Sequence, residues 1–411
     1  MIAGLRIRNF SLLQDFSLGL TREELLTDPV KQVLPLGPLV ALIGPNSSGK
    51  TTLFKSLAFL RDIILYGVAQ AAVLDQRGGF ARLRSDFAHS PQDSLSLALL
   101  LLGPENTEEL TEPASADLLS DKEGEDSIPH LASTYFYYEL EIKADRHQRP
   151  YLAGEKASRL NQTESRWQEE VILLQEGHAL QLGTGKGKFQ SFQRYETKSP
   201  GLAFWGLDRA YPDLHFILQQ LRGVFVYQAS MEVTQHKREE GGHKHLKERR
   251  DNLQNVLDYM AAKDQPAFDR WLQDSLAKIP GYQGSHKALA LDQMSTGELK
   301  LFELLVLLRD HFPLLCLEEP DVNLYYPMQE ALMKEMRDYS LRNPTSQIFY
   351  TTHNPGLLQA LRPEEVWLLE RPDRAASQAR SVASDPVVTA MYEQGLDMGM
   401  LWYGGYLDQT S

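Results

Sequence analysis

The sequence predicts an α/β protein with a parallel core sheet, an antiparallel β lobe and a helical insert. In its final third, strand patterns over 314–317, 347–352 and 365–369 alternate with a helix pattern near 328–339. Such alternation is typical of βαβ units in a parallel sheet. Two further observations support this fold class. An apolar strand leads into a glycine-rich loop near the N-terminus, and segments of strand character separated by polar turns indicate the antiparallel lobe.

The other elements follow from local patterns. Leu5, Ile7 and Phe10 in LRIRNF predict a half-buried strand, and PLVALI (38–43) predicts a buried strand followed by a helix over 52–60. The lobe strands are expected at 135–143, 170–175 and 189–196, and helices around 253–260 and 268–276.

A chain of 411 residues exceeds what one compact core usually needs, so we expect two lobes. We predict that residues 1–95 and 285–411 form the core. Residues 96–225 then form the β-rich lobe, with an acidic loop at 105–129, and residues 226–284 form a charged, helical insert.

The composition is that of a globular protein, with 42% hydrophobic and 24% charged residues. No segment approaches the roughly 20 apolar residues of a membrane helix, so we expect a cytoplasmic protein without membrane contact. The single cysteine, Cys316, excludes an internal disulfide. A net charge of −13 argues against a protein that binds nucleic acid through its overall charge. A local basic patch stays compatible with this net charge.

The most specific motif is GPNSSGKT, which matches the phosphate-loop pattern G-x-x-x-x-G-K-[ST]. Glycines let backbone N–H groups surround a phosphate, and the following helix N-terminus adds positive potential. Lys50 is expected to reach the β- and γ-phosphates, and Thr51 to hold Mg²⁺. A glycine-rich turn without ligand is the alternative. The predicted ATP-binding residues are Gly44, Pro45, Asn46, Ser47, Ser48, Gly49, Lys50, Thr51 and Thr52.

Two carboxylates follow the apolar strand LLCL. The carboxyl ends of buried parallel strands form the edge where ligands bind in open α/β folds. We expect Glu318 to hold Mg²⁺ through its water shell and Glu319 to polarise the attacking water. The strand QIFYTT ends about thirty residues later at His353, which a βαβ crossover places near Glu319. His353 is therefore a second candidate catalytic residue, with a solvated histidine as the alternative.

A second anion-binding pattern, Ser295, Thr296, Gly297 and Glu298, precedes an apolar helix. One chain needs one γ-phosphate cradle, which Lys50 already supplies. This second cradle is therefore expected to act in trans, on ATP held by another subunit. The alternative is an ordinary capped helix start, with Ser295 as N-cap and Glu298 three residues later.

The motifs GPNSSGKT, STGE, LCLEEPD and TTHNP, in this order, resemble the Walker A, signature, Walker B with D-loop, and H-switch motifs of ABC-type ATPases. LRIRNF and EEPDVNLYYP resemble the branch that contains RecF, Rad50 and the overcoming-lysogenization-defect proteins. The resemblance implies a P-loop ABC ATPase head with ATP and Mg²⁺ as cofactors. It places Asp321 and Asn323 in the D-loop. The sequence departs from this pattern at Glu318, where aspartate is commoner, and at Thr296, where transporters have glycine. Gln92 is a candidate for the Q-loop glutamine.

The resemblance implies a head-to-tail homodimer or a higher even oligomer. Two functions follow from it. In the first, the ATPase is a sensor and scaffold that controls a separate effector, such as a nuclease, in bacterial defence against phage. In the second, it resembles RecF and clamps DNA when ATP drives dimerisation. The basic stretch 236–250 is interpreted first as a solvated surface. The alternatives are a binding surface for nucleic acid or an acidic partner and, least favoured, metal binding by His236, His243 and His245.

Overall fold

The computed structural model describes residues 1–27, 35–85, 93–104, 107, 134–163, 166–183, 188–194, 197–228, 244–248, 251–282, 291–372 and 376–407. Apart from Thr107, the predicted acidic loop lies outside the described residues. Gln92 and residues 236–243, 249 and 250 of the basic stretch lie outside them as well.

The chain divides into two compact units. The first comprises Met1–Gly37, Pro45–Val224 and Leu369–Arg380, and the second comprises Pro38–Gly44, Phe225–Leu368 and Ser381–Ser411. The domain boundaries expected from the sequence stay a prediction.

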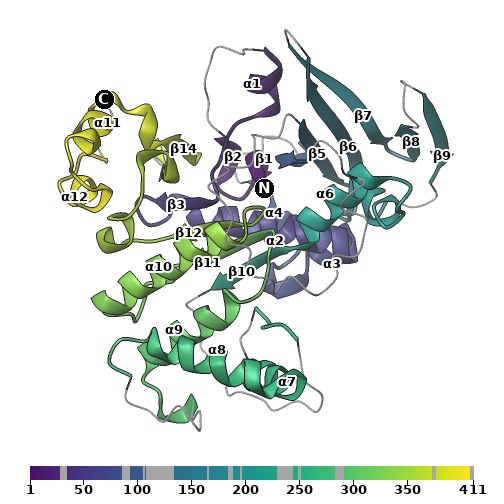
Figure 1. Ribbon diagram of the computed structural model, residues 1–411. Coiled ribbons are helices and arrows are strands. Elements are labelled where there is room, and N and C mark those ends of the chain that lie inside the picture. The colour runs from purple at the N-terminus through teal and green to yellow at the C-terminus, as the bar shows by residue number, and fades with distance from the viewer. Residues whose placement is uncertain are drawn as a thin grey trace. The chain divides into compact units, whose positions relative to one another are not determined.

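The first unit is built on an eight-stranded sheet in which neighbouring strands run antiparallel. In spatial order the strands are β2 (Leu13–Gly19), β1 (Ile2–Phe10), β4 (Leu95–Gly103), β5 (Thr134–Ala144), β6 (Pro150–Gln162), β7 (Trp167–Glu176), β8 (Ala179–Gly183) and β9 (Phe189–Gln193). Its helices are α1 (Arg22–Thr27), α2 (Lys50–Tyr66), α3 (Val68–Ala71), α4 (Phe80–Leu83), α5 (Leu202–Trp205) and α6 (Pro212–Arg222), and Figure 1 shows the long strands β5, β6 and β7 side by side.

The other sheet has six strands in the order β10 (Val224–Gln228), β11 (Leu314–Glu318), β12 (Gln347–Thr351), β3 (Leu39–Ile43), β13 (Val366–Glu370) and β14 (Gln378–Ser381). Strands β11, β12 and β3 belong wholly to the second unit. Strands β11, β12, β3 and β13 pair in parallel. The predicted α/β class is therefore confirmed. The helices of this unit are α7 (Leu253–Lys263), α8 (Gln265–Ala277), α9 (Thr296–Leu307), α10 (Tyr326–Arg342), α11 (Pro386–Glu393) and α12 (Met398–Tyr403).

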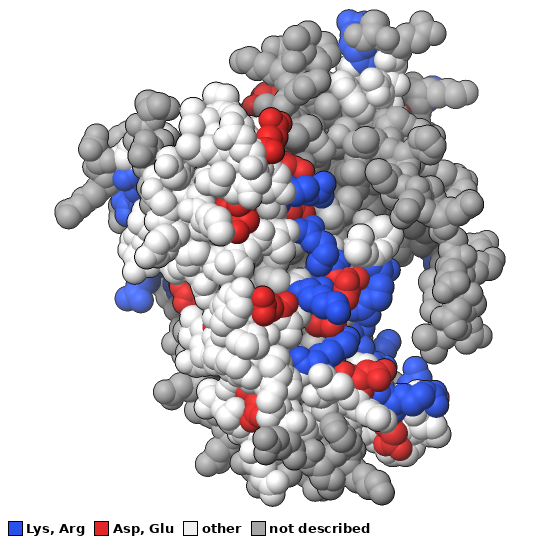
Figure 2. Space-filling model, turned by 60° about the vertical axis from the view of Figure 1, so that its left-hand side comes forward, with Lys and Arg blue, Asp and Glu red and all other residues white. Residues whose placement is uncertain are grey.

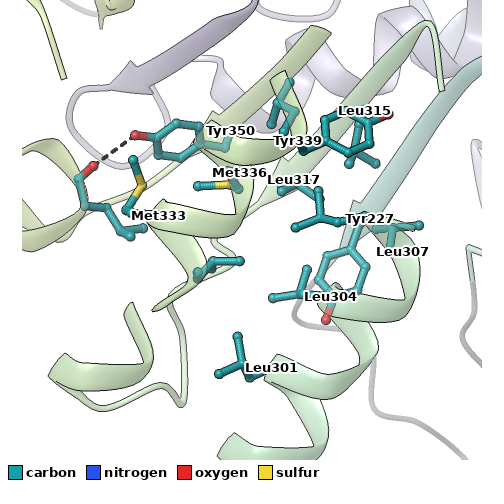
Figure 3. Close-up of a cluster of buried hydrophobic side chains, with 14 of the residues drawn as sticks. Tyr227, Leu301, Leu304, Leu307, Leu315, Leu317, Met333, Met336, Tyr339 and Tyr350 are labelled. Atoms are coloured by element: carbon teal, nitrogen blue, oxygen red, sulfur yellow. Dashed lines mark hydrogen bonds between the residues drawn. The ribbon is translucent and has the colours of Figure 1, made fainter. Parts of the chain in front are cut away.

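Strands β3 and β12 are buried along their whole length, and β11 up to its last residue, because helices supply apolar side chains to the sheet. Figure 3 shows Leu304 and Leu307 of α9 and Met336 of α10 in one buried cluster with Leu315 and Leu317 of β11. The hydroxyl of buried Tyr350 donates a hydrogen bond to the Leu357 carbonyl at 3.0 Å, so its polar atom is satisfied. None of the described helices is long and apolar enough to cross a membrane.

In the first unit, Glu169 on β7 joins α1 to the sheet. Its carboxylate accepts a hydrogen bond from Arg22 Nε at 2.9 Å and pairs with Lys156 Nζ at 2.9 Å. Burial by itself raises the pKa of Glu169, but the hydrogen bonds from Arg22 and Lys156 outweigh it and lower this pKa to about 2.

We expect Glu169→Gln to lower the free energy of unfolding by about 1–2 kcal/mol at neutral pH, a value reduced by solvent screening of the pair. A lowered folded pKa contributes stability above the unfolded pKa of about 4.3, and this contribution is lost as pH falls toward about 2. Urea unfolding at pH 7 and at pH 3 measures the difference, with exposed Glu170→Gln as the matched control. A pH-independent difference would contradict the expectation.

Candidate nucleotide site

The phosphate loop starts where buried strand β3 ends and runs into α2. Gly44, Ser47 and Gly49 have φ angles of 133°, 65° and 110°. Residues with positive φ at intervals in a turn let its backbone N–H groups point toward one side, as in an anion-binding nest. Helix α2 begins at Lys50 without a side-chain cap, so its first N–H groups are suited to a phosphate.

Glycine is required at position 49 by space as well as by conformation. A Cβ atom there would lie 2.7 Å from the buried Ser377 hydroxyl and 3.3 Å from Leu13. Any other residue would therefore meet a steric clash in addition to the cost of its left-handed backbone. Leu13 and Ser377, which are distant in the sequence, thus restrict the residue at this turn to glycine.

The side chains of this loop fit a polyphosphate. Lys50 is 7% exposed, and its ammonium donates a hydrogen bond to the Pro45 carbonyl at 3.0 Å, across the loop. The Ser48 hydroxyl is buried and has no hydrogen-bond partner among the described residues. Such an orphaned polar atom is expected where a ligand completes the site. Pro45, Asn46 and Ser47 are exposed, and Thr51 and Thr52 are half-buried in the first turn of α2.

The predicted acidic residues lie at the carboxyl edge of the second unit's sheet. Glu318, the last residue of β11, pairs in register with Thr351 at the end of β12. Strand β3 runs parallel to β12, so Gly44 leaves the same edge that presents Glu318. The start of the phosphate loop and the Walker B acid therefore share one edge, as the sequence predicts for a nucleotide site in an open α/β sheet.

Glu319 and His353 are brought together at this edge. The distance between Glu319 Oε1 and His353 Nε2 is 3.7 Å, and the two side chains are 42% and 39% exposed. Both can therefore reach a substrate from solvent. Glu319 has a φ angle of 44°, an uncommon backbone state for a residue with a side chain. Its N–H donates to Thr351 Oγ1 at 3.0 Å, which ties this strained residue to the neighbouring strand.

The signature residues form the start of α9. Ser295 Oγ accepts a hydrogen bond from the Glu298 N–H, and Glu298 Oε2 accepts one from the Ser295 N–H at 2.8 Å, so the capping box considered from the sequence is present. The cap uses the serine hydroxyl as an acceptor, which leaves its hydrogen able to donate. Ser295 and Thr296 are exposed. Gly297 allows a close approach, since a Cβ atom there would lie 2.8 Å from the Asn323 carbonyl.

The D-loop residues Asp321 and Asn323 follow Glu319 directly. Thr352 Oγ1 donates to Asp321 Oδ1 at 3.0 Å, so this loop is attached to the end of β12 next to His353. Burial raises the pKa of Asp321, whereas hydrogen bonds and the nearby Lys300 ammonium partly lower it. Asn323 is exposed and has a φ angle of 67°.

Lys300 is a residue of this site that the sequence analysis missed. It is 6% exposed, and its Nζ donates to the carbonyl oxygens of Glu319 (3.2 Å) and Val322 (2.5 Å). The only available signal was a lysine inside the apolar stretch that follows the signature. Periodicity cannot show that such a lysine reaches a loop about twenty residues later.

The fold and these motifs together are similar to those of ABC-type ATPase domains of the RecF/Rad50 type. A family profile described as "AAA domain, putative AbiEii toxin, Type IV TA system" matches residues 39–111 and 239–359, a little under half of the chain. These two segments contain every residue predicted above to bind nucleotide or metal, to act in catalysis or to form the signature and D-loop. No curated protein matches the chain significantly.

Solved structures of SMC heads are similar to the chain over most of its length. An SMC head bound to the C-winged helix domain of ScpA is 11% identical, with a TM-score of 0.48, and the match covers 93% of this chain and 99% of that one. The SMC head domain from Thermotoga maritima is 12% identical, with a TM-score of 0.37 and coverage of 92% and 98%. An SMC head with an extended coiled coil, bound to the C-terminal domain of ScpA from Pyrococcus furiosus, is 12% identical, with a TM-score of 0.41 and coverage of 96% and 99%.

Proposed function

We propose that this protein binds ATP with Mg²⁺ and hydrolyses it. The observation that carries the proposal is the sheet edge at which the phosphate loop begins, Glu318 ends its strand, and Glu319 lies 3.7 Å from His353. Lys50 and the first N–H groups of α2 would bind the phosphates, and Thr51 and Glu318 would hold Mg²⁺. The metal would supply charge neutralisation on the phosphate oxygens.

In this proposal Glu319 orients and polarises the attacking water, and His353 hydrogen-bonds the water or the γ-phosphate. Their exposure of about 40% agrees with a site that stays open to water until a second surface covers it. Ser295, Thr296, Gly297 and Glu298 of another subunit would be that surface, with the serine hydroxyl and the α9 N-terminus facing the γ-phosphate. Asp321 and Asn323 would then lie at the dimer interface. The working state is a head-to-tail homodimer or a higher even oligomer.

The dimer is tested by complementation in mixed subunits. Ser295→Arg fills the cradle that the partner's γ-phosphate needs, and Lys50→Ala removes the phosphate-binding charge, so each variant alone is expected to be inactive. A mixed dimer pairs one intact Walker A motif with one intact signature. We expect about half of the wild-type activity per mixed dimer, measured as phosphate release after co-expression with two different affinity tags. Purified mixed dimers without activity would show that the signature does not act in trans.

The resemblance supports a role for the ATPase as sensor and scaffold of a separate effector, such as a nuclease, in bacterial defence against phage. Figure 2 shows a face on which Lys and Arg side chains gather with Asp and Glu side chains among them. Mixed charges of this kind and a net charge of −13 favour a protein partner over bulk binding to nucleic acid.

Purification of the tagged protein from its native host with ATP, followed by mass spectrometry, tests the effector proposal. A stoichiometric partner whose activity changes with the nucleotide state is the expected result. ATPase activity that rises several-fold with DNA and falls with added salt, without such a partner, would instead indicate a RecF-like clamp.

A further inference from the structure

Lys300 connects the signature helix to the loop that carries the proposed catalytic glutamate. Its side chain leaves the second turn of α9 and lies almost completely buried, at 6% exposure. A buried ammonium is costly unless its hydrogen bonds are made, and this one donates to the carbonyls of Glu319 at 3.2 Å and Val322 at 2.5 Å. These contacts lie entirely within the second unit.

Glu319 needs such support because its backbone is strained. At a φ of 44° it occupies the left-handed region, which residues with a Cβ atom rarely adopt. Its N–H is held by Thr351 of β12 and its carbonyl by Lys300 of α9. A strained backbone conformation persists only when surrounding groups hold it in place. In Glu319 the backbone N–H is bonded to a strand and the backbone carbonyl to a helix.

A second contact joins the same two segments. Gly297, in the first turn of α9, approaches the Asn323 carbonyl so closely that a Cβ atom would lie 2.8 Å from it. Lys300 therefore attaches the loop 319–323 to α9 at Glu319 and at Val322, and Gly297 lies close to its last residue, Asn323. A movement of the first turn of α9 would consequently move the backbone of Glu319 in the same subunit.

We propose that Lys300 is a positioning residue that holds the Glu319 carboxylate in its reactive orientation and thereby couples the signature helix of a subunit to the catalytic glutamate of that same subunit. The inference rests on the proposed ATPase function. In this scheme Lys300 acts on the reaction through the backbone of Glu319, whose carbonyl it binds.

The first test is the kinetics of Lys300→Met, which keeps an unbranched side chain and removes the donor. A displacement of about 1 Å at a catalytic group can cost about 100-fold in rate, so we expect kcat to fall about 10- to 100-fold. The Kd for ATP should change less than about threefold, because in this proposal Lys300 acts on Glu319 and not on the phosphate loop. Lys278→Met, which removes a lysine paired with Glu335 in the same unit, is the control and should keep wild-type kcat.

A fall in kcat with little change in the Kd for ATP, together with an unchanged thermal unfolding midpoint, would exclude a merely structural role. If Lys300→Met instead weakened ATP binding and left kcat unchanged, or lost activity in proportion to a loss of folded protein, the positioning role would be overturned.

The second test distinguishes an effect of Lys300 on Glu319 from an effect on the signature. The parent protein for this test is the mixed dimer of Ser295→Arg and Lys50→Ala subunits. In that dimer the Ser295→Arg subunit supplies the working Glu319, and the Lys50→Ala subunit supplies the signature. Lys300→Met placed in the Ser295→Arg subunit should lower the parent's rate about 10- to 100-fold, as in the homodimer. Placed in the Lys50→Ala subunit, it should leave most of the rate.

A larger loss in the second arrangement would show that Lys300 serves the signature and not Glu319. Equal losses in both arrangements would show that its effect is not specific to Glu319 of its own subunit, and either result would overturn the proposal. An inactive parent dimer would count against the proposed dimer function alone, since the kinetics of the single Lys300→Met variant would still decide the positioning role.

Discussion

Lys50→Ala is expected to reduce ATPase activity by roughly 100- to 1,000-fold or more. The substitution removes a fixed positive charge that stabilises the negative charge developing on the phosphates in the transition state. Lys50 is buried at the start of α2, and its ammonium donates a hydrogen bond to the Pro45 carbonyl in the same loop. Its loss should therefore leave the packing of both units unchanged. Phosphate release under saturating ATP and Mg²⁺ measures the effect, and circular dichroism measures the fold.

Lys55→Ala is the matched control, because Lys55 lies in the same helix but is exposed. It should retain wild-type turnover and thermal stability. Wild-type turnover in folded Lys50→Ala protein would refute the assignment of the phosphate loop.

Glu319→Gln should leave ATP binding intact and reduce hydrolysis by a similarly large factor. The amide still forms hydrogen bonds, but it cannot take a proton from the attacking water. Because hydrolysis is then blocked, ATP and Mg²⁺ should hold the protein as a closed dimer. Size-exclusion chromatography with light scattering, with ATP or ADP, measures the shift from monomer to dimer.

Two comparisons make this result specific. Exposed Glu393→Gln on α11 should behave as wild type, and Glu318→Gln should raise the Mg²⁺ concentration required for activity. Normal hydrolysis by Glu319→Gln would mean that another group, with Glu318 as the nearest candidate, activates the water.

The parts of the site that are contiguous in sequence were predictable. Strand β3, the turn at Gly44–Gly49 and helix α2 follow one another, and the pattern of glycine and lysine reports a local backbone geometry. The proximity of His353 to Glu319 was also predictable, because neighbouring parallel strands bring their carboxyl ends to one edge. The capping box at Ser295 and Glu298 is local in the same way.

Other features depended on tertiary structure. The sequence alone did not indicate that β1 and β2 pair with the strands of the antiparallel sheet, since pairing joins β1 to β4 about ninety residues away. Periodicity reports which side of an element is buried but not which element covers it. Two contacts at the site illustrate this limit: Ser377 packs behind Gly49, and the Asn323 carbonyl packs against Gly297.

The sequence by itself therefore determined the class of fold, the phosphate loop and the order of the motifs, because each depends on residues within one or two neighbouring elements. Only the tertiary structure decided how Glu319 is held. Its left-handed backbone is supported by Thr351 and Lys300, which come from a different strand and a different helix. Such support is a balance between local strain and hydrogen bonds from distant residues, and no local pattern encodes both sides of that balance.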